Sequence, residues 1–187
     1  YATFVICVWG AAKVYKIGIF MHGSKPTLRD LWRWLRYSFF GKAVLDIMPL
    51  IDFYPDILHT NDWQSAMSVV YLKRKYASLP EYSHIKTIYT IHNIDYQGVF
   101  PLHIIGDVFG LDSMDDLVTV EYNDCMNLTK GAIVCADQIS TVSERYANEI
   151  QTEFYSSGLH HVLHMFADKV CGIVNGIDVD YYNPVTD

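Results

Sequence analysis

Short apolar runs alternate with amphipathic stretches along most of the chain, and this rhythm predicts its secondary structure. Four runs predict buried strands: residues 56–60, 86–93, 138–143 and 169–176. Strands that are apolar along most of their length, with helices between them, are typical of a parallel sheet covered on both faces. The pattern therefore predicts a doubly wound α/β fold.

Helical periodicity fills much of the sequence between these runs. The longest predicted helix covers residues 28–48, with Thr27 as a suitable N-cap and Pro49 as its stop. Further helices are expected at residues 63–76, 123–136, 144–152 and 159–167. Alternating apolar residues at 4–8 and 14–19 predict two more strands, which could pair as a hairpin.

Polar clusters follow the four main strands, at residues 59–63, 92–93, 143–144 and 175–178. The carboxyl ends of parallel strands meet at one edge of a sheet, where such folds bind their ligands, so these clusters are expected to converge there. Turn preferences explain the Asn, Asp, Ser and Gly residues. They do not explain two histidines and a tryptophan.

The densest cluster is the stretch HNIDYQG at residues 92–98, which begins with His92. A histidine after a strand can be a structural residue that bonds a neighbouring carbonyl. Here it is followed closely by amide, carboxylate and phenol groups, which suit the hydroxyls of a sugar-like ligand. We therefore treat His92 as the leading candidate for a ligand contact.

Charge and motifs exclude several other functions. The formal net charge of -7, without a long basic run, argues against nucleic acid and anionic membrane surfaces as partners. The N-terminal apolar run is too short to span a bilayer. The sequence has no G-x-x-x-x-G-K-[ST], G-x-G-x-x-G or G-x-S-x-G motif, and its four cysteines lack metal or redox spacing.

A metal site or cofactor is not expected either. His160 and His164 share a helix face but have no evident third ligand. Asp178 and Asp180 imitate a metal-binding D-x-D pair, but after a glycine turn they are better suited to capping a helix. The NLT tripeptide at 127–129 matches a glycosylation acceptor, yet it falls within a predicted helix.

Four blocks closely resemble the bacterial glycogen synthases and plant starch synthases, in the order that this family has them. They are PDILHTNDWQSAMSVVYLK (55–73), TIYTIHNIDYQGVFP (87–101), ADQISTVSERYANEIQTEF (136–154) and GIVNGIDVDYYNPVTD (172–187). The resemblance implies the Rossmann-like N-terminal, acceptor-side lobe of a two-lobed GT-B fold at residues 27–187. Residues 1–26 match poorly and are expected to be strands of the same lobe.

The resemblance also implies an activity. Such enzymes transfer glucose, with retention, from ADP-glucose, or less often UDP-glucose, to the non-reducing end of an α-1,4-glucan. They need no metal, because helix dipoles and basic side chains offset the charge of the leaving diphosphate. The expected partners are therefore a nucleotide sugar and an α-glucan, and the expected compartment is a bacterial cytoplasm or a plastid stroma.

Matching motif positions carry the site residues of the family over to this chain. His92 corresponds to the catalytic, glucose-contacting histidine of the H-N-x-x-x-Q-G motif. The remaining positions would bind or enclose the substrates: Asp62, Trp63, Asn93, Tyr96, Gln97, Gly98, Asn175 and Gly176.

Two parts of the family pattern are expected outside this sequence: a Lys-x-Gly-Gly loop before residue 1 and the second lobe after Asp187. The chain alone is therefore expected to transfer little or no glucose. One alternative is a carbohydrate-binding remnant without catalysis. Another is a lobe of a different GT-B transferase, such as a sucrose or trehalose-phosphate synthase, although the HNIDYQG block argues against it. The choice between ADP and UDP donors, and the oligomeric state, stay open.

Overall fold

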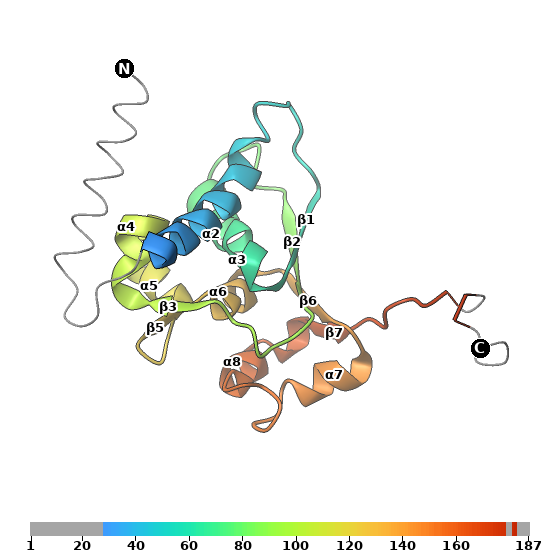
Figure 1. Cartoon of the computed structure of the whole chain (residues 1–187). Coiled ribbons are helices and arrows are strands. Elements are labelled where there is room, and N and C mark those ends of the chain that lie inside the picture. Colours follow the sequence, from blue (N-terminus) through green and yellow to red (C-terminus); the bar gives the residue numbers. More distant parts are fainter. Residues whose placement is uncertain (1–27, 179–180, 183–187) are drawn as a thin grey trace, which may run out of the picture.

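The computed structural model describes residues 28–178 and 181–182 (Figure 1). The strands predicted at 4–8 and 14–19, Thr27 and Asp180 lie outside the described residues. Within the described part, no helix is both long enough and apolar enough to cross a bilayer.

Four parallel strands form the main sheet. They are β1 (Ile57–Asn61), β2 (Lys86–Ile91), β6 (Gln138–Thr141) and β7 (Val170–Gly172), in the order β1-β2-β6-β7. Helices lie in each of the three connections between consecutive strands of this sheet (Figure 1). The α/β fold with a parallel sheet that the sequence predicts is therefore confirmed.

Most predicted helices form where the periodicity places them. The structure has α2 (Leu28–Asp46), α3 (Asp62–Tyr71) continuing into the π-helical turn η1 (Leu72–Tyr76), α6 (Leu128–Cys135), α7 (Glu144–Glu149) and α8 (His160–Met165). Short 3-10 helices occur at η2 (Leu102–Ile104) and η3 (Ala167–Lys169). The observed helices are mostly shorter than the predicted ones, because helix ends are weakly specified by periodicity.

The segment between β2 and α6 differs from the prediction. It contains α4 (Ile105–Phe109), α5 (Met114–Val120) and a small antiparallel sheet of β3 (Val99–Pro101), β5 (Cys125–Asn127) and β4 (Glu121–Tyr122). The helix predicted at 123–136 is wrong over its first five residues. Asn123 and Asp124 have φ angles of 53° and 59°, so they form a hairpin turn, a conformation that Asn and Asp tolerate well.

Asn127 ends this hairpin and caps helix α6. Its Oδ1 accepts a hydrogen bond from the Lys130 amide at 2.9 Å. The side chain is 2% exposed, so the formal glycosylation acceptor is buried in the fold.

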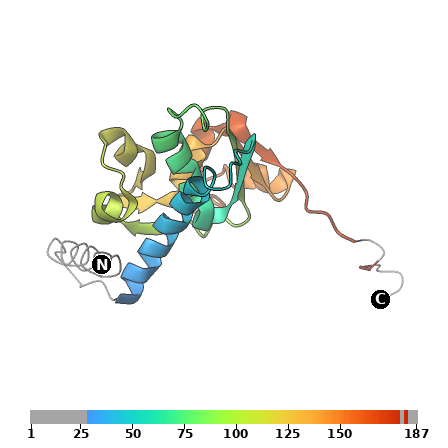
Figure 2. The same ribbon diagram turned by 90° about the horizontal axis from the view of Figure 1, so that it is seen from above.

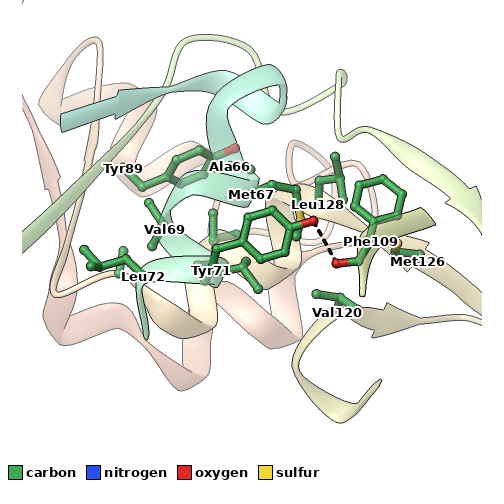
Figure 3. Close-up of a cluster of buried hydrophobic side chains, with 14 of the residues drawn as sticks. Ala66, Met67, Val69, Tyr71, Leu72, Tyr89, Phe109, Val120, Met126 and Leu128 are labelled. Carbon is green, nitrogen blue, oxygen red and sulfur yellow. Dashed lines mark hydrogen bonds between the residues drawn. The ribbon is translucent and has the colours of Figure 1, made fainter. Parts of the chain in front are cut away.

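Helix α3 lies in the centre of the core (Figure 3). Its apolar face, with Ala66, Met67 and Val69 fully buried, packs between α2 and α6. Tyr71 donates a hydrogen bond to the Phe109 carbonyl at 2.9 Å, and burial raises the pKa of its phenol to about 12. Removing this apolar surface from water is the main force that holds the helices against the sheet.

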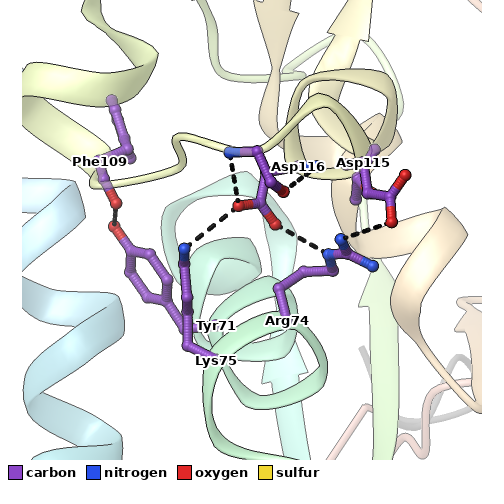
Figure 4. A network of polar contacts seen from close by, with 8 residues as sticks. Tyr71, Arg74, Lys75, Phe109, Asp115 and Asp116 are labelled. Carbon is purple, nitrogen blue, oxygen red and sulfur yellow. Dashed lines mark hydrogen bonds and ion pairs between the residues drawn. The ribbon is translucent and has the colours of Figure 1, made fainter.

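A buried carboxylate joins α5 to η1 (Figure 4). Arg74 Nε donates to Asp116 Oδ1 at 2.9 Å, and Lys75 Nζ donates to Oδ2 at 3.2 Å. Asp116 also forms a reciprocal capping box with Ser113 at the start of α5. Two adjacent cations of the π-helical turn thus converge on one carboxylate of a neighbouring helix.

Candidate functional site

Three of the predicted polar clusters lie at the same edge of the main sheet. In the parallel register Asn61 pairs with Thr90, and Ile91 pairs with Thr141, so β1, β2 and β6 end side by side. Residues 61–62, 92–93 and 143–144 therefore emerge at one edge. This is the arrangement expected for a ligand site in an open parallel sheet.

Asp62 connects two of these strand ends. Its Oδ1 accepts a hydrogen bond from the His92 backbone amide at 2.8 Å. Asp62 has φ 54°, a left-handed conformation that costs free energy for a residue with a side chain. Strain of this kind persists where the surrounding structure imposes it, and here it places the carboxylate under the His92 backbone.

The His92 ring lies at the exposed end of β2. Its Nε2 is 3.1 Å from Asn61 Oδ1, and Asn61 does not use its side chain to cap α3. Because the Asn61 oxygen can only accept, this contact favours the tautomer with its proton on Nε2. In that tautomer Nδ1 can accept a hydrogen bond from a ligand hydroxyl.

Asn93 shapes the loop that follows. Its Oδ1 accepts a hydrogen bond from the Asp95 amide at 2.9 Å, which closes a tight turn. Ile94 is only 2% exposed, and its amide donates to the Tyr146 hydroxyl on α7 at 3.0 Å. The loop is therefore anchored to the body of the protein directly after His92.

Gln97 and Gly98 tie the end of this loop to the start of α6. The Gln97 carbonyl accepts from the Thr129 amide at 3.1 Å, and the Gly98 carbonyl accepts from the Leu128 amide at 3.2 Å. These amides belong to the first turn of α6, whose N–H groups have no partner within the helix. Capping the helix in this way holds the loop backbone in one position.

The Gln97 side chain is also engaged with protein at both ends. Its Oε1 accepts from Asn127 Nδ2 at 2.7 Å, and its Nε2 donates to the Ser157 carbonyl at 2.9 Å. The structure therefore places Gln97 beside the site with its amide already bonded to two other segments.

An aromatic hollow of about 460 Å³ opens beside this loop. Trp34, Trp63, Tyr96 and Phe100 contribute its rings, and Asp95 and Gln97 contribute polar groups. Tyr96 is 66% exposed, so its ring face is open to a ligand. Aromatic walls with a few polar groups are typical of small-molecule sites, but His92 does not line this hollow.

Asn175 and Gly176 are not brought to the other candidates. Strand β7 ends at Gly172, whereas the sequence predicts a strand to 176. After the hydrogen bond from Ile173 N to Thr141 O, residues 173–178 are exposed and lead away from the body (Figures 1 and 2). Few contacts hold this segment, so the apolar pattern alone does not extend the strand.

His59 belongs to the sheet itself. It lies inside β1, and its Nε2 is 2.7 Å from Thr90 Oγ1, which in turn is 2.6 Å from Ser140 Oγ. The cluster predicted at 59–63 thus reaches the edge only from Asn61 onward.

The described part of the chain contains no group of three or more His, Cys, Asp and Glu side chains that could hold a metal ion. On α8 the rings of His160 and His161 lie 3.9 Å apart. Asp178 Oδ1 accepts from the Tyr181 amide at 2.9 Å, which is a turn-closing contact.

Sequence reasoning missed three residues that hold the candidate site together. Tyr146, Asn127 and Ser157 all bond the loop at 92–98, but each lies 30 or more positions away from the residue that it bonds. Asn127 carried a signal, because an Asn before an apolar run is a helix-cap signature. No pattern in the sequence marks Ser157.

Comparison with known proteins adds independent evidence. A family model described as the starch synthase catalytic domain matches residues 22–165, which include all the candidates except Asn175 and Gly176. The chain is 47% identical over 155 residues to the glycogen synthase of Natranaerobius thermophilus and 48% identical over 153 residues to that of Clostridioides difficile. Each match covers 81% of this chain, but only 31% and 32% of the relatives, respectively.

A solved structure shares the fold. The catalytic domain of starch synthase IV from Arabidopsis thaliana, bound to ADP and acarbose, superposes with a TM-score of 0.69 at 34% sequence identity. The match covers 90% of this chain and 34% of that chain. The chain thus spans about a third of the length of the proteins that it matches.

Proposed function

Because the chain belongs to the family of starch synthase catalytic domains, we propose that it is the acceptor-side lobe of a glucosyltransferase that extends α-1,4-glucans. The donor in this proposal is ADP-glucose, and the transfer retains the configuration of the sugar. The presence of ADP and acarbose in the Arabidopsis relative supports this choice of ligand classes.

One observation carries the proposal. His92 is held at the carboxyl edge of the sheet by Asp62 and Asn61, at the start of the loop whose residues 95–98 line a hollow together with Trp63. This places a hydrogen-bonding ring and flat apolar surfaces within one region, and a sugar offers both hydroxyls and apolar ring faces to such a site.

The side chains of this lobe would act by positioning rather than by covalent catalysis. Asp62 and Asn61 fix the His92 backbone and ring, so that Nδ1 can accept a hydroxyl of the glucose unit. The rings of Trp63 and Tyr96 would support the glucan chain. Holding the two reactants in the correct geometry lowers the barrier without a protein nucleophile.

The proposed partners are a nucleotide sugar and an α-glucan. No metal ion takes part in the proposed reaction. The proposed compartment, a bacterial cytoplasm or a plastid stroma, follows from the bacterial and plant relatives.

Replacing His92 by alanine is expected to weaken acarbose binding by about 10-fold, because one hydrogen bond to a hydroxyl of the sugar is lost. The measurement is titration calorimetry of acarbose into the 187-residue chain. His84→Ala serves as the matched control, since His84 is also exposed but precedes β2 at the opposite end of the strand. Equal affinities for the two variants would contradict the role given to His92.

Catalysis needs a separate test, because a binding remnant would also retain acarbose. Residues 22–165 can replace the matching segment of the Clostridioides difficile glycogen synthase, and transfer from ADP-[14C]glucose to glycogen can then be measured. We expect the chimera to incorporate label and its His92→Ala form to incorporate less. A chimera that binds acarbose but transfers nothing would favour the non-catalytic alternative.

A further inference from the structure

Ser157 contacts the loop at 92–98 through two different groups. It lies between α7 and α8, about 60 positions further along the chain. Its hydroxyl donates to the Asp95 carboxylate, and its carbonyl oxygen accepts from Gln97 Nε2 at 2.9 Å. The next residue, Gly158, is held by the Tyr122 hydroxyl, which donates to its carbonyl at 2.5 Å.

The backbone of Ser157 is strained. Its φ angle is 48°, in the left-handed region, and Gly158 follows with φ 89°. Glycine adopts such angles freely, whereas serine does so at a cost. A turn that served only to connect α7 to α8 would be at least as stable with glycine at 157. The serine hydroxyl that the turn retains is the one that bonds Asp95.

Both partners of Ser157 line the aromatic hollow, and Ser157 itself does not. Gln97 is held from its other side by Asn127, which caps α6. The loop is therefore fixed between the start of α6 and the α7–α8 connection. Loss of either support would free the polar wall of the hollow to move.

We propose that Ser157 is a positioning residue of the candidate glucan site, which holds Asp95 and Gln97 in place without touching the sugar. The proposal rests on the function proposed above, since it assigns the hollow to a glucan. Ser157 would act on the site by ordering the loop at 92–98, so its effect can be measured both with and without a ligand.

The decisive variant is Ser157→Gly. It removes the hydroxyl and at the same time relieves the left-handed strain. If the turn serves only to connect α7 to α8, the variant should therefore be as stable in urea as the wild type, or more stable. A positioning role predicts faster amide hydrogen exchange at residues 94–98. It also predicts acarbose binding weaker by about fivefold, because the freed Asp95 side chain must be ordered again when the sugar binds.

Two further variants complete the test. Ser157→Asn is expected to restore slow exchange and binding, because Asn tolerates the left-handed region and its amide can donate to Asp95. Ser83→Gly is the control: Ser83 is exposed before β2, and its hydroxyl donates only locally, to the Pro80 carbonyl at 2.9 Å. It should leave exchange at 94–98 and acarbose affinity unchanged.

The outcomes separate the two proposals. Unchanged exchange at 94–98 in Ser157→Gly overturns the positioning role, and so does faster exchange with unaltered acarbose affinity. If the wild-type chain does not bind acarbose, the proposed function fails. In that case, comparing amide hydrogen exchange at residues 94–98 between Ser157→Gly and Ser83→Gly still decides whether Ser157 orders the loop.

Discussion

Replacing Gly98 by alanine is expected to lower the free energy of unfolding by about 3 kcal/mol, through overpacking and left-handed strain together. Gly98 has φ 65°, and a Cβ atom built there would lie 2.6 Å from Trp63 Cε3 and 3.1 Å from Trp63 Cβ. The Trp63 ring cannot easily yield, because it is packed 4.5 Å from the Tyr37 ring, centroid to centroid. The added methyl group must therefore displace either the loop or the ring.

Gly110→Ala is a closely matched control for this prediction. Gly110 has φ 63°, but a Cβ atom there would have no neighbour within 4 Å. Its replacement should cost only the left-handed strain, roughly 1 kcal/mol. Urea unfolding of both variants isolates the clash with Trp63 as the difference. Equal losses in the two variants would show that Trp63 does not pack against Gly98 as described.

Replacing Asp116 by asparagine is expected to destabilise the protein by about 3 kcal/mol, because it removes the buried charge that receives hydrogen bonds from Arg74 and Lys75. Asp116 is 2% exposed and receives hydrogen bonds from Arg74 and Lys75. The control is Asp115→Asn on the same helix. Asp115 also faces Arg74, at 3.5 Å, but its side chain is 84% exposed. An exposed pair of this kind contributes about 0.5 kcal/mol, so chemical denaturation should rank the two variants clearly. Similar losses would contradict the buried network.

The same carboxylate predicts a dependence of stability on pH. Burial alone would raise the pKa of Asp116, but hydrogen bonds from Arg74, Ser113 and Lys75 outweigh it and lower the pKa from 3.8 to about 2. The folded state therefore prefers the charged form, and the contribution of Asp116 is complete above pH 4. It is lost as the pH falls from 4 towards 2, and its full size is about 2 kcal/mol. Asp116→Asn should lack this part of the acid-induced loss, whereas Asp115→Asn should retain it.

The sequence predicted the parallel sheet and the edge at which the ends of its strands meet. Apolar runs of strand length mark β1, β2 and β6, and parallel pairing then requires their ends to meet. His92 emerges at this edge, together with Asp62 and Asn93, as expected. The substrate roles assigned to these residues stay predictions, and the acarbose experiments above test them.

Sequence reasoning failed where short-range pattern and local geometry disagree. The apolar periodicity predicts a helix at residues 123–127. Instead, Asn123 and Asp124 adopt left-handed φ angles that turn the chain into a hairpin, and periodicity carries no information about such angles. The strand predicted to 176 ends at Gly172. As a result Asn175 and Gly176 stand apart from the other candidates.

By itself, the sequence determined the alternation of strands and helices, the family likeness and the edge at which polar residues gather, because these depend on local apolar pattern and on motif order. Only the tertiary structure decided how the site is held. It bonded Asp62 to His92, occupied both ends of the Gln97 amide, and brought Ser157 against Asp95 from some 60 positions away. Contacts of this kind form when packing of the core brings distant backbone segments together, and a local pattern of residues cannot predict them.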